Sequence, residues 1–99
     1  MLNFEQAKVI ALSKLKEIEN EAKIRLAFFE NDTLSFDYGW VFFYQSEEFV
    51  KTGDTQNMIG GNAPILIDKY DGNIYLTGTR KDIKEYVKIY SEFKKTWLS

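Results

Sequence analysis

The fold is predicted from residues 60–74, which read GGNAPILIDKYDGNI. Pro64 can open a strand, because its missing N–H matters least at the first strand position. The apolar residues 65–67 continue that strand, and the Asp-Gly pair at 71–72 predicts a tight turn into a partner strand over residues 74–77. The two glycines that begin the stretch predict a loop with a positive φ angle. The stretch therefore predicts a loop followed by an antiparallel hairpin.

Two further strands are predicted upstream of this hairpin. Residues 24–29 show a period of two, and a polar turn follows at 30–33. Residues 34–45 show the clearest alternation in the chain and predict one long strand with one face on the core. The apolar members of that alternation are Leu34, Phe36, Tyr38, Trp40, Phe42 and Tyr44. With the hairpin, these segments predict a four-stranded antiparallel sheet.

Amphipathic helices are predicted at both ends of the chain. Asn3 is a suitable N-cap with Gln6 as its capping-box partner, and apolar residues recur at helical spacing over residues 4–20. A Thr-x-x-Asp cap at 79–82 introduces a second helix over residues 80–97. We expect both helices to cover the apolar face of the sheet. The prediction is a single domain, residues 1–99, with an α+β fold: a two-layer sandwich of N-terminal helix, four-stranded antiparallel sheet and C-terminal helix.

The segment between the second and third strands is predicted to be mostly irregular. Ser46 caps a short helical turn over residues 46–50, which closes before Gly53, and residues 51–62 form a polar loop. Trp40 lies on an apolar periodic face of the long strand, and Trp97 on that of the second helix. We therefore expect both tryptophans to be core residues rather than ligand-stacking platforms.

Composition excludes several classes of function. The chain has no histidine and no cysteine, so it lacks the usual general base at neutral pH, thiol chemistry and the common zinc ligands. Its net charge of −2 argues against nucleic-acid binding. No apolar run approaches the length of a membrane span, and the first six residues do not predict a signal peptide. We expect a cytoplasmic protein without metal, cofactor, nucleic-acid or membrane partner.

The carboxylates offer little catalytic chemistry. Asp68 and Asp71 are expected to bond the amides of the hairpin turn and the Lys69 side chain. Glu47 and Glu48 are expected to stabilise the short helical turn by their charge near its N-terminus. A small enzyme that uses Asp68, Asp71 or tyrosine residues is the alternative to this structural interpretation.

An apolar patch is predicted on the second face of the sheet. If Trp40 faces the helices, the odd-numbered Val41 and Phe43 face outward, and Phe29 and Tyr75 join them on neighbouring strands. Exposed apolar patches on small proteins mark partner sites. The alternatives are that residues 46–62 fold over this patch or that a homodimer covers it.

Several segments together resemble a known family. In order they are GWVFF at 39–43, EFVKTGD at 48–54, GNAP at 61–64, IDK at 67–69, GNI at 72–74, LTGT at 76–79 and EY at 85–86. Their order and spacing resemble the YrhB domain family, also called the immunity protein 35 family. The resemblance spans about residues 36–90.

The resemblance implies a small bacterial α+β protein that neutralises a cognate polymorphic toxin by direct stoichiometric binding to its effector domain. It implies no catalytic residues, so we expect no enzymatic activity. For the toxin-binding surface we predict Phe29, Val41, Phe43 and Tyr75 as apolar anchors. The acidic Asp37, Glu47 and Glu48 are predicted as rim charges that steer association. The alternative is a chaperone-like binding protein that uses the apolar sheet face.

Overall fold

The computed structural model describes residues 1–98, with side chains described through residue 96. In chain order its elements are α1 (Phe4–Ala22), β1 (Leu26–Phe28), the 3-10 turn η1 (Glu30–Asp32), β2 (Leu34–Phe36), β3 (Gly39–Phe42), β4 (Tyr44–Ser46), α2 (Glu47–Thr52), the 3-10 turn η2 (Thr55–Asn57), β5 (Ile65–Asp68), β6 (Ile74–Leu76) and α3 (Ile83–Leu98). The α+β fold with a helix at each end is confirmed.

The strands form two antiparallel sheets that share one long segment of chain. The larger sheet has the order β2-β3-β5-β6, and the smaller pairs β1 with β4. Only Phe43 separates β3 from β4. The ladder of the smaller sheet continues past its end, because the amide of Phe29 donates to the carbonyl of Phe43 over 2.9 Å. Residues 39–46 thus contribute one strand to each of the two sheets.

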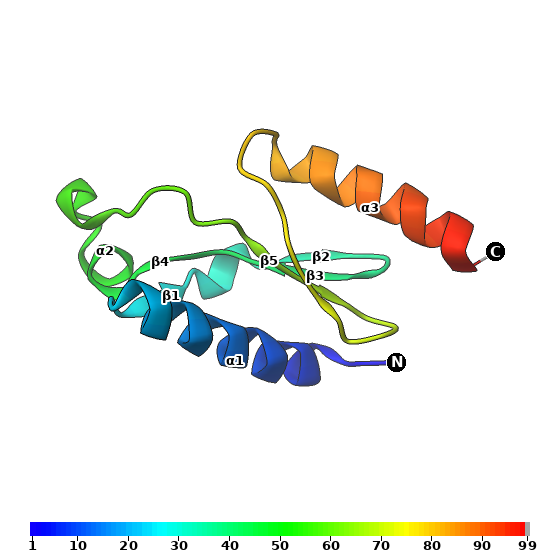
Figure 1. Ribbon diagram of the computed structural model, residues 1–99, viewed down its shortest axis with the longest axis horizontal. Coiled ribbons are helices and arrows are strands. Elements are labelled where there is room, and N and C mark those ends of the chain that lie inside the picture. Colours follow the sequence, from blue (N-terminus) through cyan, green and yellow to red (C-terminus); the bar gives the residue numbers. More distant parts are fainter. Residues whose placement is uncertain (99) are drawn as a thin grey trace.

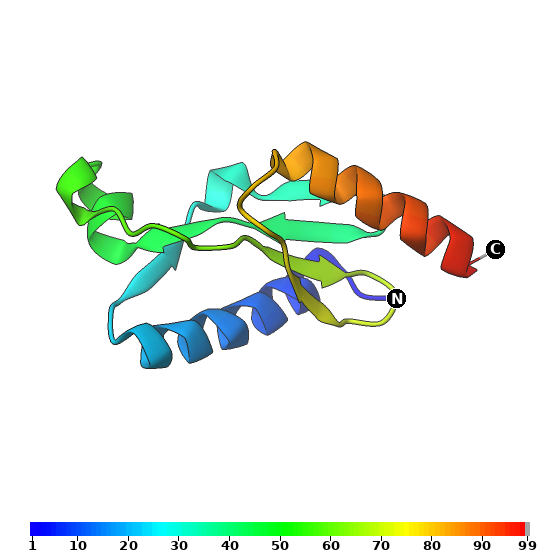
Figure 2. The ribbon, with the colours of Figure 1, turned by 45° about the horizontal axis from the view of Figure 1, so that its top comes forward.

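The two long helices lie on opposite faces of the larger sheet (Figures 1 and 2). On one face, the buried α1 residues Ala7, Ala11 and Leu15 belong to the same core cluster as Trp40, Phe42, Ile65 and Ile67. On the other face, the Tyr90 ring of α3 lies 5.2 Å from that of Tyr75 in β6. The prediction that both helices cover the same face of the sheet is therefore wrong. The second face is also apolar, since it carries Val41 paired with Leu66, and it therefore needs a cover of its own.

The predicted long strand over residues 34–45 is wrong at its centre. The chain turns back at residues 37–38, so β2 and β3 form a hairpin in which Phe36 pairs with Gly39. Residues paired in this way share a face of the sheet, so a two-residue turn moves the alternation from even to odd positions. Leu34 accordingly lies on the face of Val41, away from Trp40. Alternation in sequence continues unbroken through such a turn and cannot reveal it.

The predicted helix caps are mostly confirmed. Asn3 and Gln6 form the capping box of α1. Ser46 caps α2, which ends at Gly53 in the left-handed conformation. The third helix starts later than predicted, because Asp82 rather than Thr79 accepts a bond from its first turn, the amide of Lys84 donating over 3.1 Å.

Trp40 is buried, as predicted. The side chain of Trp97, predicted to be core, lies outside the described residues. Within residues 1–98, none of the helices combines the length and the apolar character that a membrane span requires.

Candidate functional site

The seven residues predicted to bind a partner do not form one surface. Val41 is completely buried, at 0% exposure, so the prediction that it is an outward anchor is wrong. It lies between Leu34 of β2 and Leu66 of β5 on the face that α3 covers (Figure 1). Asp37 is exposed in the β2–β3 turn, at the opposite end of the molecule from α2 (Figure 1).

Two of the predicted anchors meet beside α2. Phe29 and Phe43 are cross-strand neighbours at the end of the smaller sheet, and both are half-buried. They line a hollow of about 540 Å3 that is mostly apolar in its side chains. Phe49 of α2 meets Phe29 edge to face, with ring centroids 6.0 Å apart, and Met58 of the following loop closes one side.

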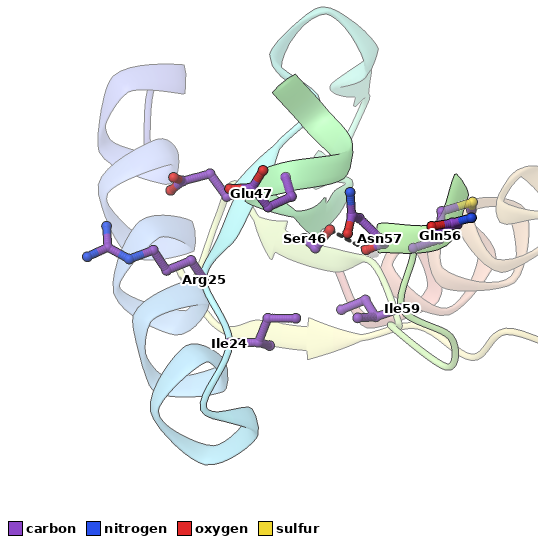
Figure 3. Close-up of a pocket in the computed structure, with 9 residues that line it drawn as sticks. Ile24, Arg25, Ser46, Glu47, Gln56, Asn57 and Ile59 are labelled. Atoms are coloured by element: carbon purple, nitrogen blue, oxygen red, sulfur yellow. Dashed lines mark hydrogen bonds between the residues drawn. The ribbon is translucent and has the colours of Figure 1, made fainter. Parts of the chain in front are cut away.

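A second hollow, of about 410 Å3, adjoins the first because Met58 lines both. Glu47 and Glu48 of α2 line this hollow. Figure 3 shows Glu47 on one side of it, with Ile24 and Arg25 from the segment after α1. We call the six residues that these two hollows bring together at one end of the molecule the α2 surface. They are Phe29, Phe43, Glu47, Glu48, Phe49 and Met58.

Buried polar side chains fix the backbone of the α2 surface. The side chain of Gln45, which is only 6% exposed, bonds both backbone groups of Ile59. Its Nε2 donates to the Ile59 carbonyl over 2.8 Å, and its Oε1 accepts from the Ile59 backbone amide over 2.9 Å. The Ser46 hydroxyl donates to the Asn57 carbonyl (dashed in Figure 3) and accepts from the Phe49 amide. The side-chain Nδ2 of Asn62 donates to the Tyr44 carbonyl over 2.7 Å. These bonds attach residues 57, 59 and 62 of the loop predicted over residues 51–62 to β4. Polar residues in a strand pattern are the sequence signal for these bonds, and the sequence interpretation missed them.

Tyr75, the last predicted anchor, belongs to a separate surface between β6 and α3. A hollow of about 300 Å3 is lined there by apolar and aromatic side chains. We call its four exposed members the β6–α3 surface: Tyr75 at 39%, Leu76 at 52%, Ile89 at 51% and Phe93 at 65% exposure. Phe93 stands at helical spacing from Tyr86 and Tyr90, yet its side chain is largely exposed rather than packed on the sheet.

The hairpin carboxylates hold α3 rather than an open site. The carboxylate of Asp68 accepts from the amides of Tyr70 and Asp71 over 2.7 and 3.1 Å, as predicted. Its cation is Lys94 rather than the predicted Lys69, with Nζ 3.1 Å from Oδ2. The Tyr90 hydroxyl donates to the same oxygen. Lys69 instead lies over the Trp40 ring, 5.4 Å from its centroid.

The charges in this network stabilise one another despite their burial. Burial acts to raise the pKa of the Asp68 carboxyl, but bonds from Tyr90, two amides and Lys94 outweigh it and lower that pKa. Burial acts to lower the pKa of Lys94, and its bonds to Asp68 and Asp71 outweigh it and raise that pKa. Burial and the bond to Asp68 both raise the pKa of the Tyr90 phenol. The cluster is an anchor for α3, and none of its carboxylates lines the three hollows described above.

Comparison with known proteins agrees with the resemblance of the sequence segments. The model of a family described as Immunity protein 35 matches residues 5–97. The uncharacterized protein YrhB of Escherichia coli (strain K12) is 42% identical to this chain over 62 residues. That match covers 63% of this chain and 66% of the length of YrhB. No solved structure matches.

Proposed function

Because this chain belongs to the Immunity protein 35 family, we propose that it is a bacterial immunity protein that neutralises a cognate polymorphic toxin by binding the toxin's effector domain stoichiometrically. The observation that carries this proposal is the family match over residues 5–97. Inhibition by binding needs a stable scaffold and a surface with a few anchors, but no catalytic group. We place this activity in the cytoplasm.

We propose the α2 surface as the toxin-binding site. It offers the half-buried rings of Phe29 and Phe43 in an apolar hollow, with Glu47 and Glu48 beside them. Apolar anchors surrounded by charges are typical of tight and rapidly formed complexes. The bonds from Gln45 hold the adjoining loop in place, so little ordering is required on binding.

Co-expression tests the activity directly. The wild-type chain, produced together with the toxin encoded beside its gene, should restore growth and co-purify with the toxin in a stoichiometric complex. A toxin that kills equally well in the presence of this chain, and that does not co-purify with it, would remove the proposal.

A pair of charge reversals tests the surface. Glu48→Lys changes an exposed carboxylate on the α2 surface, and Asp37→Lys changes an exposed carboxylate at the opposite end of the molecule. We expect Glu48→Lys to slow association at low salt by about tenfold. Asp37→Lys is the matched control and should stay within about twofold of wild type. The reverse ranking would place the toxin at the β2–β3 turn.

A chaperone-like binding role is the second candidate. Val41, on the sheet face expected to bind client proteins, is completely buried. The β6–α3 surface, however, exposes four large apolar side chains. We expect such a protein to suppress aggregation of unrelated heat-denatured enzymes at near-equal ratio, and Phe93→Lys to weaken that suppression. Strict dependence on a single partner would contradict this role.

A further inference from the structure

We propose that β6 is a self-association site, at which two copies of this chain pair their β6 strands antiparallel about a two-fold axis. This inference is independent of the proposed toxin binding. It relocates the homodimer considered from the sequence, which was expected to form through the face of the sheet, to the sheet's edge.

Among the described residues, β6 is the last strand in the order β2-β3-β5-β6 and has no strand on its outer side. The Asn73 carbonyl accepts from the Asp68 amide over 3.1 Å, and the Thr77 amide donates to the Pro64 carbonyl over 3.1 Å. In an antiparallel ladder alternate residues face the same neighbour, so residues 73, 75 and 77 face β5. Ile74 and Leu76 therefore direct their amide and carbonyl groups away from the sheet.

Residues 73–79, which form this edge, also lack the usual protection against pairing. Edge strands usually avoid intermolecular pairing by means of charges, prolines or covers. Residues 73–79 contain no charged residue and no proline. All three β6 residues are exposed, Ile74 at 38%, Tyr75 at 39% and Leu76 at 52%. The other edge, β2, is less exposed and lies between the exposed Asp32 and Asp37.

Two-fold symmetry permits a register in which two β6 strands satisfy each other's outward backbone groups. Pairing Ile74 with Leu76 of the second copy, and Leu76 with Ile74, brings together only residues whose backbone groups point outward. Tyr75 then faces Tyr75 of the second copy as a non-hydrogen-bonded pair, with Cα atoms about 4.5 Å apart. The apolar side chains exposed in the monomer become cross-strand neighbours in the dimer.

Charge favours the β6 edge over the β2 edge. Residues 73–79 carry no charge, so two β6 strands can meet without repulsion. Pairing two β2 strands would instead bring the exposed Asp32 and Asp37 of the two copies together. Of the two edges of the sheet, β6 is therefore the one that a second copy of the chain can approach.

Sedimentation velocity over a range of concentrations is the first test. We expect a reversible dimer with Kd on the order of 10 µM, since the paired strands are short. Ile74→Lys places a lysine on the β6 edge and should make the protein monomeric throughout. Ser35→Lys places a lysine on the exposed position of the β2 edge and is the matched control, which should still dimerise. Circular dichroism verifies that both variants fold.

Single cysteines provide a second test with positional resolution, because the natural chain has none. Tyr75→Cys puts two thiols opposite each other across the two-fold axis at a separation suited to a disulfide. Ile74→Cys lies one residue away on the same strand, but its thiol faces Leu76 of the second copy. Under mild oxidation we expect Tyr75→Cys to form a covalent dimer at least about tenfold faster than Ile74→Cys.

Three outcomes would overturn the inference. They are a wild-type protein that stays monomeric at all concentrations, a dimer that survives Ile74→Lys, and equal crosslinking rates for the two cysteine variants. A monomeric wild type whose toxin binding is abolished by Ile74→Lys would assign this edge to the toxin instead.

Discussion

Lys94 of the C-terminal helix is buried against Asp68 of the sheet, with 3.1 Å between Nζ and Oδ2. Their side chains are 4% and 0% exposed, and Lys94 also reaches Asp71 over 3.2 Å. The pair joins residues at the end of β5 to the last turns of α3. Together with the bond from the Tyr90 hydroxyl to Asp68, it attaches a helix whose apolar flank is largely exposed.

Removing the cation should destabilise the protein strongly. In Lys94→Met the buried Asp68 carboxylate loses its charge partner, and we expect the free energy of unfolding in urea to fall by about 3 kcal/mol. The bonds from Tyr90 and two amides keep the loss toward the lower end of the range for such pairs. Lys95→Met, at the neighbouring exposed position, is the control and should change stability by less than about 0.5 kcal/mol. Equal losses in the two variants would contradict this account.

The same carboxylate should make stability depend on acid. Because the pKa of Asp68 is lowered in the folded protein, its contribution is fully present above the unfolded-state pKa of about 4. It is lost as pH falls through the lower pKa of the folded state. Urea unfolding between pH 7 and 2 should show this loss in wild type. Asp68→Asn should be less stable than wild type at pH 7, and its free energy of unfolding should depend less steeply on acid pH. An unchanged pH dependence in this variant would contradict the role of Asp68.

Tyr90 should make the stability of the protein fall at alkaline pH. Its phenol has a raised pKa in the folded protein, so its contribution is present below the unfolded-state pKa of about 10 and is lost as pH rises beyond it. Deprotonation of Lys94 adds to this fall in stability, because the pKa of Lys94 is raised as well. Tyr90→Phe should flatten the fall in stability between pH 9.5 and 11.5, measured by urea unfolding. Tyr38→Phe, which changes a half-buried tyrosine elsewhere, is the comparison.

Gln45 should control the order of the loop that borders the α2 surface. Gln45→Ala leaves the Ile59 amide and carbonyl without their partner, which should cost about 2 kcal/mol of stability. Hydrogen exchange at Ile59 should become at least about tenfold faster. Gln56→Ala, at an exposed position of the same loop, should leave that exchange rate unchanged. Unaltered exchange in Gln45→Ala would show that the loop is held by other contacts.

Gly39 should tolerate no side chain. A Cβ atom at this position would overlap the carbonyl oxygen of Ile67 on the neighbouring strand. We expect Gly39→Ala to lower the free energy of unfolding by about 3 kcal/mol, because backbone of the central strands must move. Gly60→Ala is the control, since a Cβ there meets nothing within 4 Å. Similar stability of the two variants would contradict the close approach.

Local features of the fold were predictable because they depend on neighbouring residues. The capping box of Asn3 and Gln6 and the cap at Ser46 follow from side chains three residues from their targets. The hairpin turn at Gly72, with φ of 70°, follows from an Asp-Gly pair. The β2–β3 hairpin was missed because the aromatic residues on either side of Asp37 continue one alternation while changing faces.

The candidate site was less predictable because it depends on which face each helix covers. Phe29 and Phe43 line one hollow, and Glu47 lines the hollow that adjoins it. Val41 was misplaced because both faces of the sheet are apolar, and sequence periodicity does not assign α3 to either. The contact between Lys94 and Asp68 spans 26 residues of chain and has no local signal.

The position of α3, on the face of the sheet opposite α1, has a consequence for local unfolding (Figure 1). The helix can leave the sheet without displacing the core to which α1 belongs, since that core lies on the other face. We therefore expect a partially unfolded species, in which α3 is released while the α1 core stays folded, at a lower free energy than global unfolding. In that species Val41 and Leu66 are uncovered, so the second apolar face of the sheet becomes accessible.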